Sequence, residues 1–206
     1  MYKLITFEGG SQGIIKDPNS PKLLKMRCSQ VQYPKIKFDD IKTLKFDTTC
    51  GKCYIEQNPD QIIDFKTLAD MYAEFINGEN DRSGGVKSLR VDQDDESMKA
   101  MLIVGILVRD DGLYIIPDGD TGFVKGFMSF SQKGKDKPIG LISNLYVNPK
   151  YRNSRIGSHL LDYANVLAST NNFNSVELAC WSSNKIAFDI YTSRGFKVVE
   201  DVTETK

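Results

Sequence analysis

The chain has 206 residues, of which 40% are hydrophobic and 26% are charged, and its 27 Lys and Arg residues balance its 27 Asp and Glu residues. This length suits one domain of ordinary size with an extension, and the zero net charge argues against nucleic acid or a membrane surface as a partner. The sequence does not open on a basic segment followed by an apolar stretch, and its longest apolar run, Met101–Val108, is too short to cross a membrane, so we expect a cytoplasmic protein.

Residues 1–51 form the part of the chain whose role the sequence leaves open. Short strand patterns occur at Tyr2–Phe7 and Gln32–Phe38, with turn signals between them. We therefore divide the chain into a β-rich N-terminal extension, residues 1–51, and a main domain, residues 52–206. The extension either packs on the main domain or binds a partner, and the pattern does not decide between the two.

Two of the four cysteines, Cys50 and Cys53, have the two-residue gap that zinc ligands and redox pairs use. The sequence holds no second such pair, and its single histidine, His159, falls on a predicted helix. Structural thiols are the preferred interpretation, zinc or redox use is the alternative, and we predict no metal site.

Apolar periodicity predicts the elements of the main domain. In chain order they are a strand at 53–56, a helix at 60–76, strands at 101–109 and 123–130 with an insert at 110–122, a strand at 139–147, a helix at 156–169, a strand at 176–180, a helix within 184–194 and a strand at 196–202. Residues 77–98 are polar and carry an acidic cluster, Asp92, Asp94, Asp95 and Glu96. That cluster is either a solvated loop or a rim that attracts a cationic amine.

The stretch from Leu141 to Ser169 combines a strand, a tight turn, a polar loop and a long amphipathic helix. Asn148-Pro149 ends the strand, and residues 152–157 lead into the helix. A helix start offers unpaired backbone N–H groups and the positive end of the helix dipole. The loop is therefore suited to an anion such as a pyrophosphate.

Two sequence motifs in this half of the chain resemble those of the GNAT superfamily of N-acetyltransferases. VNPKYRNSRIGSHLL, residues 147–161, is similar to the coenzyme motif V-x-P-x-Y-R-x-x-G-x-G-x-x-L-L, with Arg155 in place of its first glycine. A side chain there leaves less room for a close backbone approach but adds a cation. NKIAFDIYTSRGF, residues 184–196, is similar to the later motif N-x-x-A-x-x-x-Y-x-x-x-G-F at every defining position.

The resemblance implies an α/β (α+β) fold, with a mixed and mostly antiparallel sheet flanked by helices. It also implies direct acetyl transfer from acetyl-CoA to a primary amine, carried by a small molecule or a protein. The residues implied in binding acetyl-CoA are Leu145, Tyr146, Val147, Arg152, Asn153, Ser154, Arg155, Ile156, Gly157, Ser158 and Asn184. A GNAT-fold module that binds acyl-CoA or a partner without catalysis is the alternative.

Tyr191 is the residue that the resemblance implies for proton transfer. A phenol with a pKa near 10 can return a proton to a leaving thiolate with a pKa of about 8.5. The strand at 139–147 has no carboxylate, so a general base would have to come from Asp92–Glu96 or from a chain of waters.

The predicted sheet ends one strand earlier than in many relatives. An uncovered sheet edge favours aggregation. We expect either the N-terminal extension or a second subunit of a homodimer to cover it.

Overall fold

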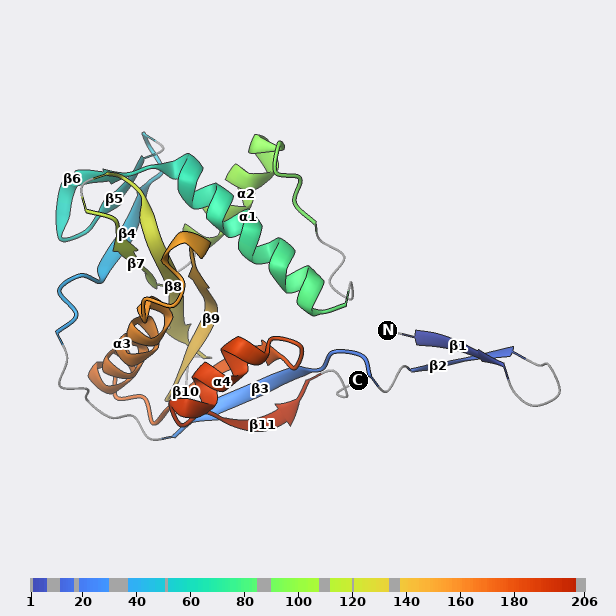
Figure 1. Ribbon diagram of the computed structural model, residues 1–206. Helices are drawn as coiled ribbons and strands as arrows, with labels where there is room; N and C mark the ends of the chain where they lie inside the picture. Colours follow the sequence, from blue (N-terminus) through green and yellow to red (C-terminus); the bar gives the residue numbers. More distant parts are fainter. Residues whose placement is uncertain are drawn as a thin grey trace.

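A computed structural model describes the backbone of residues 2–6 and 12–16 and all atoms of residues 19–29, 37–50, 52–84, 90–107, 112–119, 121–133 and 138–202. Within this part, a nine-stranded sheet is flanked by four α-helices (Figure 1). Its strands are β3 (Leu23–Cys28), β4 (Lys42–Asp47), β5 (Lys52–Ile55), β6 (Asn58–Ile63), β7 (Gly112–Pro117), β8 (Val124–Gln132), β9 (Ile139–Val147), β10 (Ser175–Trp181) and β11 (Lys197–Asp201). The helices are α1 (Phe65–Arg82), α2 (Glu96–Leu107), α3 (Ile156–Thr170) and α4 (Lys185–Ser193), with a short 3-10 turn η1 (Pro149–Tyr151).

The order of the strands is β11-β3-β10-β9-β8-β7-β4-β5-β6. All neighbouring pairs are antiparallel except β9 and β10, which run parallel. The predicted fold class, a mixed and mostly antiparallel sheet flanked by helices, is confirmed.

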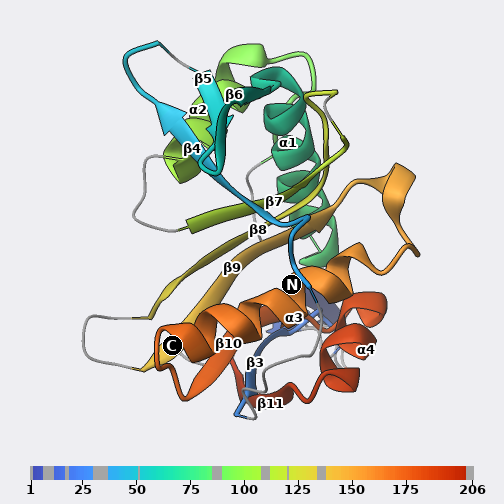
Figure 2. The same cartoon turned by 90° about the vertical axis from the view of Figure 1, so that its left-hand side faces the viewer.

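Each face of the sheet carries its own hydrophobic core, because successive side chains of a strand point to opposite faces. On β8, Phe127 packs with α1 and α2, whereas its neighbour Met128 packs with α3 and α4. Figure 2 shows α1 and α2 on one side of β7, β8 and β9 and α3 on the other. The molecule therefore has three layers, and any site at the middle of the sheet can take side chains from both helical layers.

The N-terminal residues contribute to this sheet directly. β3 lies between β10 and β11 and pairs with both in antiparallel fashion, and its Met26 and Cys28 are fully buried. β4 pairs with β5 and β7. β1 (Tyr2–Thr6) and β2 (Gln12–Lys16) pair with each other in a separate two-stranded sheet. Two segments of residues 1–51, Leu23–Cys28 and Lys42–Asp47, thus belong to the main sheet, while a functional division at residue 51 stays a prediction.

The expected strand at 101–109 is wrong, because residues 96–107 form helix α2. The run from Met101 to Leu107 is apolar throughout and has neither a strand period nor a helix period. Polar residues just before this run determine that it forms a helix. The Asp95 side chain accepts a hydrogen bond from the backbone N–H of Met98 at 2.9 Å, as an N-cap does, and buried Lys99 ties the first turn to α1.

Other boundaries also differ from the prediction, and the first helix ends at Arg82 rather than at residue 76. The first helix begins at Phe65 rather than at residue 60, because Asp64 caps it by accepting from the Thr67 N–H at 2.9 Å. Residues 58–63 before it form strand β6. The expected insert at 110–122 contains strand β7, which pairs with β4 and β8.

The remaining elements agree with the prediction within one or two residues. They are β5, β8, β9, α3, β10, α4 and β11. The strand pattern expected at Gln32–Phe38 lies mostly outside the described residues. No helix in the described part of the chain is long and apolar enough to cross a membrane.

Candidate functional site

The parallel strands β9 and β10 part halfway along their length. Their pairing runs from Ile139 and Ser175 to Ile142 and Leu178 and then stops. Beyond that point β9 continues to Val147 paired with β8, and β10 continues to Trp181 paired with β3. We call the diverging segments, Ser143–Val147 and Ala179–Trp181, the parting.

A β-bulge at Ser143 marks the beginning of the parting. On β8, Ser129 and Phe130 are adjacent, but their partners on β9 are Asn144 and Ile142. The extra residue, Ser143, is exposed, and it resets which face each later side chain takes. Leu145 then packs in the α3 layer and Tyr146 in the α1 layer.

The turn after β9 is built by local hydrogen bonds. Asn148 caps η1 by accepting from the Lys150 N–H at 3.0 Å, and the Arg152 N–H donates to the Pro149 carbonyl at 3.2 Å. The Ser154 hydroxyl donates to the Tyr151 carbonyl. Asn153 and Arg155 then adopt left-handed φ values of 63° and 66° and turn the chain into α3.

The backbone N–H groups of residues 153–158 donate no hydrogen bond within the described part of the chain. The first amide of this region with an acceptor is that of His159, which donates to the Arg155 carbonyl at 2.9 Å. No side chain caps α3, and its first turn has no acidic residue. Six consecutive free donors at the positive end of a helix dipole are an arrangement that favours an anion.

Two arginines add positive charge to this turn. The Arg155 side chain is exposed and makes no hydrogen bond or ion pair in the described part of the chain. Arg152 donates from Nε to the Val147 carbonyl at 3.2 Å, and its guanidinium lies 5.9 Å from the centre of the Tyr146 ring. The Arg155 side chain therefore has no protein partner among the described residues, whereas Arg152 is engaged by Val147 and Tyr146.

Tyr191 reaches the parting from helix α4. Asn184 caps this helix by accepting from the Ala187 N–H at 3.4 Å, and Gly195, with a φ of 81°, ends it. Tyr191 is buried and packs near Phe196, with 6.1 Å between ring centres. Burial raises its pKa above the ordinary value, and the neighbouring groups Cys180 and Glu79 act in the same direction. The phenol therefore keeps its proton at neutral pH.

The C-terminal end of α1 closes one side of the parting. The Ser183 hydroxyl, in the turn between β10 and α4, donates to the Arg82 carbonyl, and Arg82 forms an ion pair with Glu79 at 2.9 Å. Cys180 on β10 is buried, and burial raises its pKa to about 11. A thiol in that state is protonated near pH 7 and is a poor nucleophile.

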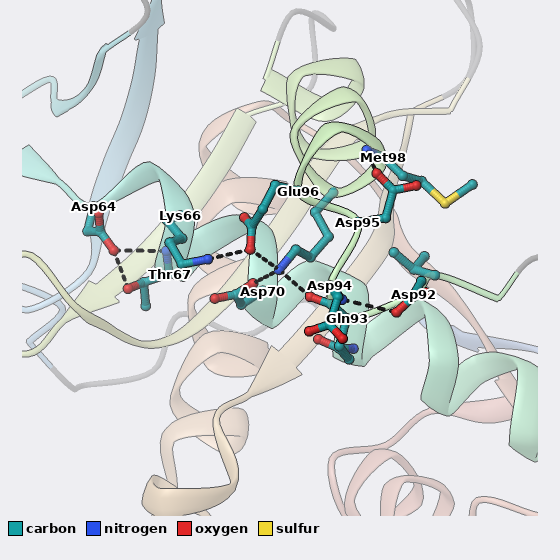
Figure 3. A network of polar contacts seen from close by, with 12 residues as sticks. Asp64, Lys66, Thr67, Asp70, Asp92, Gln93, Asp94, Asp95, Glu96 and Met98 are labelled. Atoms are coloured by element: carbon teal, nitrogen blue, oxygen red, sulfur yellow. Dashed lines mark hydrogen bonds and ion pairs between the residues drawn. The ribbon is translucent and has the colours of Figure 1, made fainter.

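The acidic cluster expected to form a solvated loop or a rim stabilises the start of α2 (Figure 3). Asp92 accepts from the Asp94 N–H at 3.0 Å, and Glu96 pairs with Lys66 and Lys99. Lys99 is 2% exposed and also contacts Asp70 and the Gln93 carbonyl. Most of these carboxylates serve the fold of the loop.

Sequence reasoning missed one carboxylate at the site, Glu74 on α1. The hydroxyl of Tyr146 donates to a Glu74 carboxylate oxygen. In the sequence Glu74 is one exposed acid of an amphipathic helix, with no sign of its partner 72 residues further on. Only the bulge at Ser143, which turns Tyr146 toward α1, brings the two together.

The cysteine pair takes two different environments. Cys50 is exposed in a turn, whereas Cys53 on β5 is buried, and burial raises its pKa to about 12. The described residues contain no group of three or more side chains that could hold a metal ion.

A helix start with free amides beside two diverging parallel strands defines the candidate site of this α/β protein, and sequence comparison specifies the family. Residues 74–196 match the family model described as acetyltransferase (GNAT) family. The match covers more than half of the chain, and the protein belongs to this family. No curated protein matches it significantly by sequence.

Solved structures of low sequence identity share the fold. A conserved protein of unknown function from Staphylococcus epidermidis has a TM-score of 0.54 at 13% identity, over 87% of this chain and 58% of its own. A GNAT-family protein from Novosphingobium aromaticivorans has a TM-score of 0.53 at 11% identity, over 90% and 66%. A GNAT-family acetyltransferase from Staphylococcus aureus has a TM-score of 0.50 at 16% identity, over 80% and 88%. The chain thus spans less than two thirds of the length of the first two.

Proposed function

We propose that the protein is an acetyl-CoA-dependent N-acetyltransferase that moves an acetyl group directly to a primary amine. The row of unpaired amides at residues 153–158, next to the parting of β9 and β10, carries this proposal. A diphosphate fits those donors, and a linear pantetheine arm fits the edge of β9 that β10 leaves after Ile142.

The residues present suit each part of such a coenzyme. Amides 153–158, with Arg152 and Arg155, would hold the diphosphate. The backbone of Leu145, Tyr146 and Val147 would run beside the arm, with its N–H and C=O groups as partners. Bound acetyl-CoA would supply an acetyl group activated as a thioester. Asn184 caps α4 through its Oδ1, and its Nδ2 would donate to the arm, so the two roles are compatible.

The amine must lose a proton before it attacks, and because β9 offers no carboxylate, that proton leaves through a chain of waters. The chain's own groups act on the leaving side. Tyr191, like any phenol, holds a proton on its Oη at neutral pH, and we assign it as the donor to the leaving thiolate. Burial raises its pKa, which makes this transfer uphill in the protein without its coenzyme. The Cys180 thiol, with its pKa of about 11, does not compete as a nucleophile. These two states favour direct transfer over an acyl-enzyme.

Two measurements test this function. Calorimetric titration with acetyl-CoA reports binding, and CoA release over a panel of primary amines reports turnover. We expect both. The absence of any carboxylate on β9 favours one rival, a GNAT-fold module that binds acyl-CoA without catalysis. Tight coenzyme binding without CoA release on any amine would establish that rival, and no binding at all would refute both.

The substitution Tyr191→Phe tests the proton donor. Loss of a general acid lowers turnover by about 10²- to 10⁴-fold, while the affinity for acetyl-CoA stays within about twofold, because the ring still packs against Phe196. Tyr163→Phe is the matched control, since Tyr163 is a half-buried tyrosine of the same layer that packs against Tyr114. Equal turnover in the two variants would remove this role from Tyr191.

A further inference from the structure

Helix α1 carries four acidic residues, and three of them are paired with cations. Asp70 pairs with Lys99, Glu79 with Arg82, and Asp81 with Arg90. Glu74 has no ion pair in the described part of the chain, and its one polar partner there is the hydroxyl of Tyr146, a neutral group. Glu74 is also exposed. An exposed carboxylate without a cation, among acids that all have one, is a candidate binding site for a positively charged ligand.

The position of Glu74 relates it to the parting of β9 and β10. Its partner Tyr146 lies on the half of β9 that β10 does not pair. The Tyr146 ring is 8% exposed and is fixed by Phe127 and Phe75, with ring centres 5.6 and 6.4 Å away. A rigid aromatic side chain thus holds the carboxylate against the strand along which the coenzyme arm is proposed to run.

On this basis, and resting on the proposed function, we infer that Glu74 binds the cationic nitrogen of the acceptor amine. The phenol of Tyr146 occupies one lone pair of the carboxylate, and the others remain for N–H donors of an ammonium group, a charge-assisted contact. Among the described residues Arg152 lies over the Tyr146 ring, and its Nε is already held by the Val147 carbonyl. Pairing with the acceptor therefore does not require a protein cation to be displaced.

The pKa values of an ammonium group and a carboxylate show that Glu74 would bind the acceptor rather than take its proton. An alkylammonium has a pKa near 10 and an ordinary glutamic acid one near 4.3, so a carboxylate alone does not hold the amine's proton. The Glu74 carboxylate therefore attracts the positive charge of the ammonium group. Acceptors with an isolated ammonium group, such as alkylamines and lysine side chains, fit better than free α-amino acids, whose own carboxylate next to the nitrogen would be repelled.

The test compares Glu74→Gln with Asp81→Asn, which neutralises another exposed acid of the same helix. The probes are butylamine, a cation at neutral pH, and aniline, which is neutral, both with acetyl-CoA. We expect Glu74→Gln to raise the KM for butylamine about 10- to 100-fold, the range for loss of a hydrogen bond to a charged group, and to leave the KM for aniline within about twofold. Tyr146→Phe, which keeps the carboxylate, should raise the KM for butylamine only a few-fold. Asp81→Asn should change neither KM.

The outcomes separate this inference from the proposed function. If the wild-type protein acetylates butylamine and Glu74→Gln matches Asp81→Asn, the role of Glu74 is refuted and the function stands. A parallel rise in both KM values, or a lower melting temperature, would also refute it by showing a structural role. If the wild type releases no CoA, the proposed function fails. Calorimetric titration of butylamine onto the CoA complex then decides whether Glu74 binds ammonium.

Discussion

The two halves of strand β9 have the same chain direction and the same neighbour on one side, yet they differ on the other. Ile139–Ile142 lies between β8 and β10, so it has partners on both edges. Ser143–Val147 keeps β8 and loses β10. The paired half is part of the scaffold, whereas the open half and the turn after it leave backbone groups for a ligand. In this fold a strand changes from paired on both edges to paired on one edge within one bulge.

The open half of β9 exists because β10 continues beside β3, its neighbour on the other side, and no longer beside β9. β3 pairs with β10 along six residues, from Val176 to Trp181, and with β11 along its outer edge. A segment from the N-terminal part of the chain therefore fixes one side of the parting. Leu23–Cys28 thus adds a strand between β10 and β11, while β11 stays the edge strand of the sheet among the described residues, so the cover expected for that edge stays a prediction.

The largest effect is expected from removal of β3. A chain that begins at Gln30 leaves β10 and β11 without their shared partner and loses the buried Met26, so its loss of stability should be comparable to the about 5–15 kcal/mol that holds a typical domain together. A chain that begins at Asn19 keeps β3 and should melt within a few degrees of the full-length protein. Circular dichroism melting curves and gel filtration measure both. A cooperative transition in the shorter chain near that of the full length would contradict the role of β3.

Two glycines offer an intermediate test, one for each half of β9. A Cβ on Gly126, opposite Val147, would lie 2.8 Å from the Tyr146 carbonyl oxygen and 3.0 Å from Ile156 Cγ2. A Cβ on Gly140, in the paired half, would lie 2.8 Å from Phe130 Cε2 and 3.2 Å from Phe173 Cδ2. Each change to Ala should lower the free energy of unfolding by about 1–3 kcal/mol, the usual cost of overpacking.

Only one of these two substitutions should change the affinity for the coenzyme. Gly126→Ala pushes on the open strand and on the first residue of α3, so we expect the affinity for acetyl-CoA to fall about tenfold, which is 1.4 kcal/mol. Gly140→Ala should leave that affinity unchanged. Urea unfolding and calorimetry on the two variants measure both quantities. Equal losses of affinity would show that the two halves of β9 are not functionally distinct.

Sequence reasoning predicted the second half of the chain far better than the first. From Ile139 to Asp201 each element alternates or repeats cleanly and is bounded by a clear stop, such as Asn148-Pro149 or Gly195. In the first half, the run 101–107 is apolar at every position, so its helical state depends on the cap at Asp95 and on buried Lys99. β3 was not expected at all, because its place between β10 and β11 is set by pairing over about 150 residues of chain.

The same distinction holds for the candidate site. The amides of residues 153–158 could be anticipated, because a turn followed by a helix start creates them locally. Glu74 could not, because its importance comes from Tyr146, and the direction of Tyr146 comes from one extra residue in a strand. A site made by one continuous segment can be predicted from the sequence. A site made by two segments can be predicted only when the pairing register of the strands is known.

The smallest expected effect concerns Arg155, where the chain departs from the family motif. Its φ of 66° is left-handed, a conformation that costs a residue with a Cβ about 1–2 kcal/mol, whereas glycine adopts it freely but loses about 0.5–1 kcal/mol of backbone entropy. Arg155→Gly should therefore raise the free energy of unfolding by about 0.5 kcal/mol, while Arg155→Ala keeps the strain and should not. Urea unfolding distinguishes the two.

Coenzyme affinity measured on the same two variants separates the charge of Arg155 from the amides beside it. Both variants remove one exposed cation, which is worth up to about 1 kcal/mol, so the affinity for acetyl-CoA should fall no more than about fivefold in each, and less at high salt. A fall beyond a hundredfold in both would mean that the guanidinium, and not the row of amides at 153–158, holds the diphosphate. Because Arg155→Gly also relaxes the turn, a gain of affinity in that variant alone would show that the left-handed arginine holds the amides away from their best geometry.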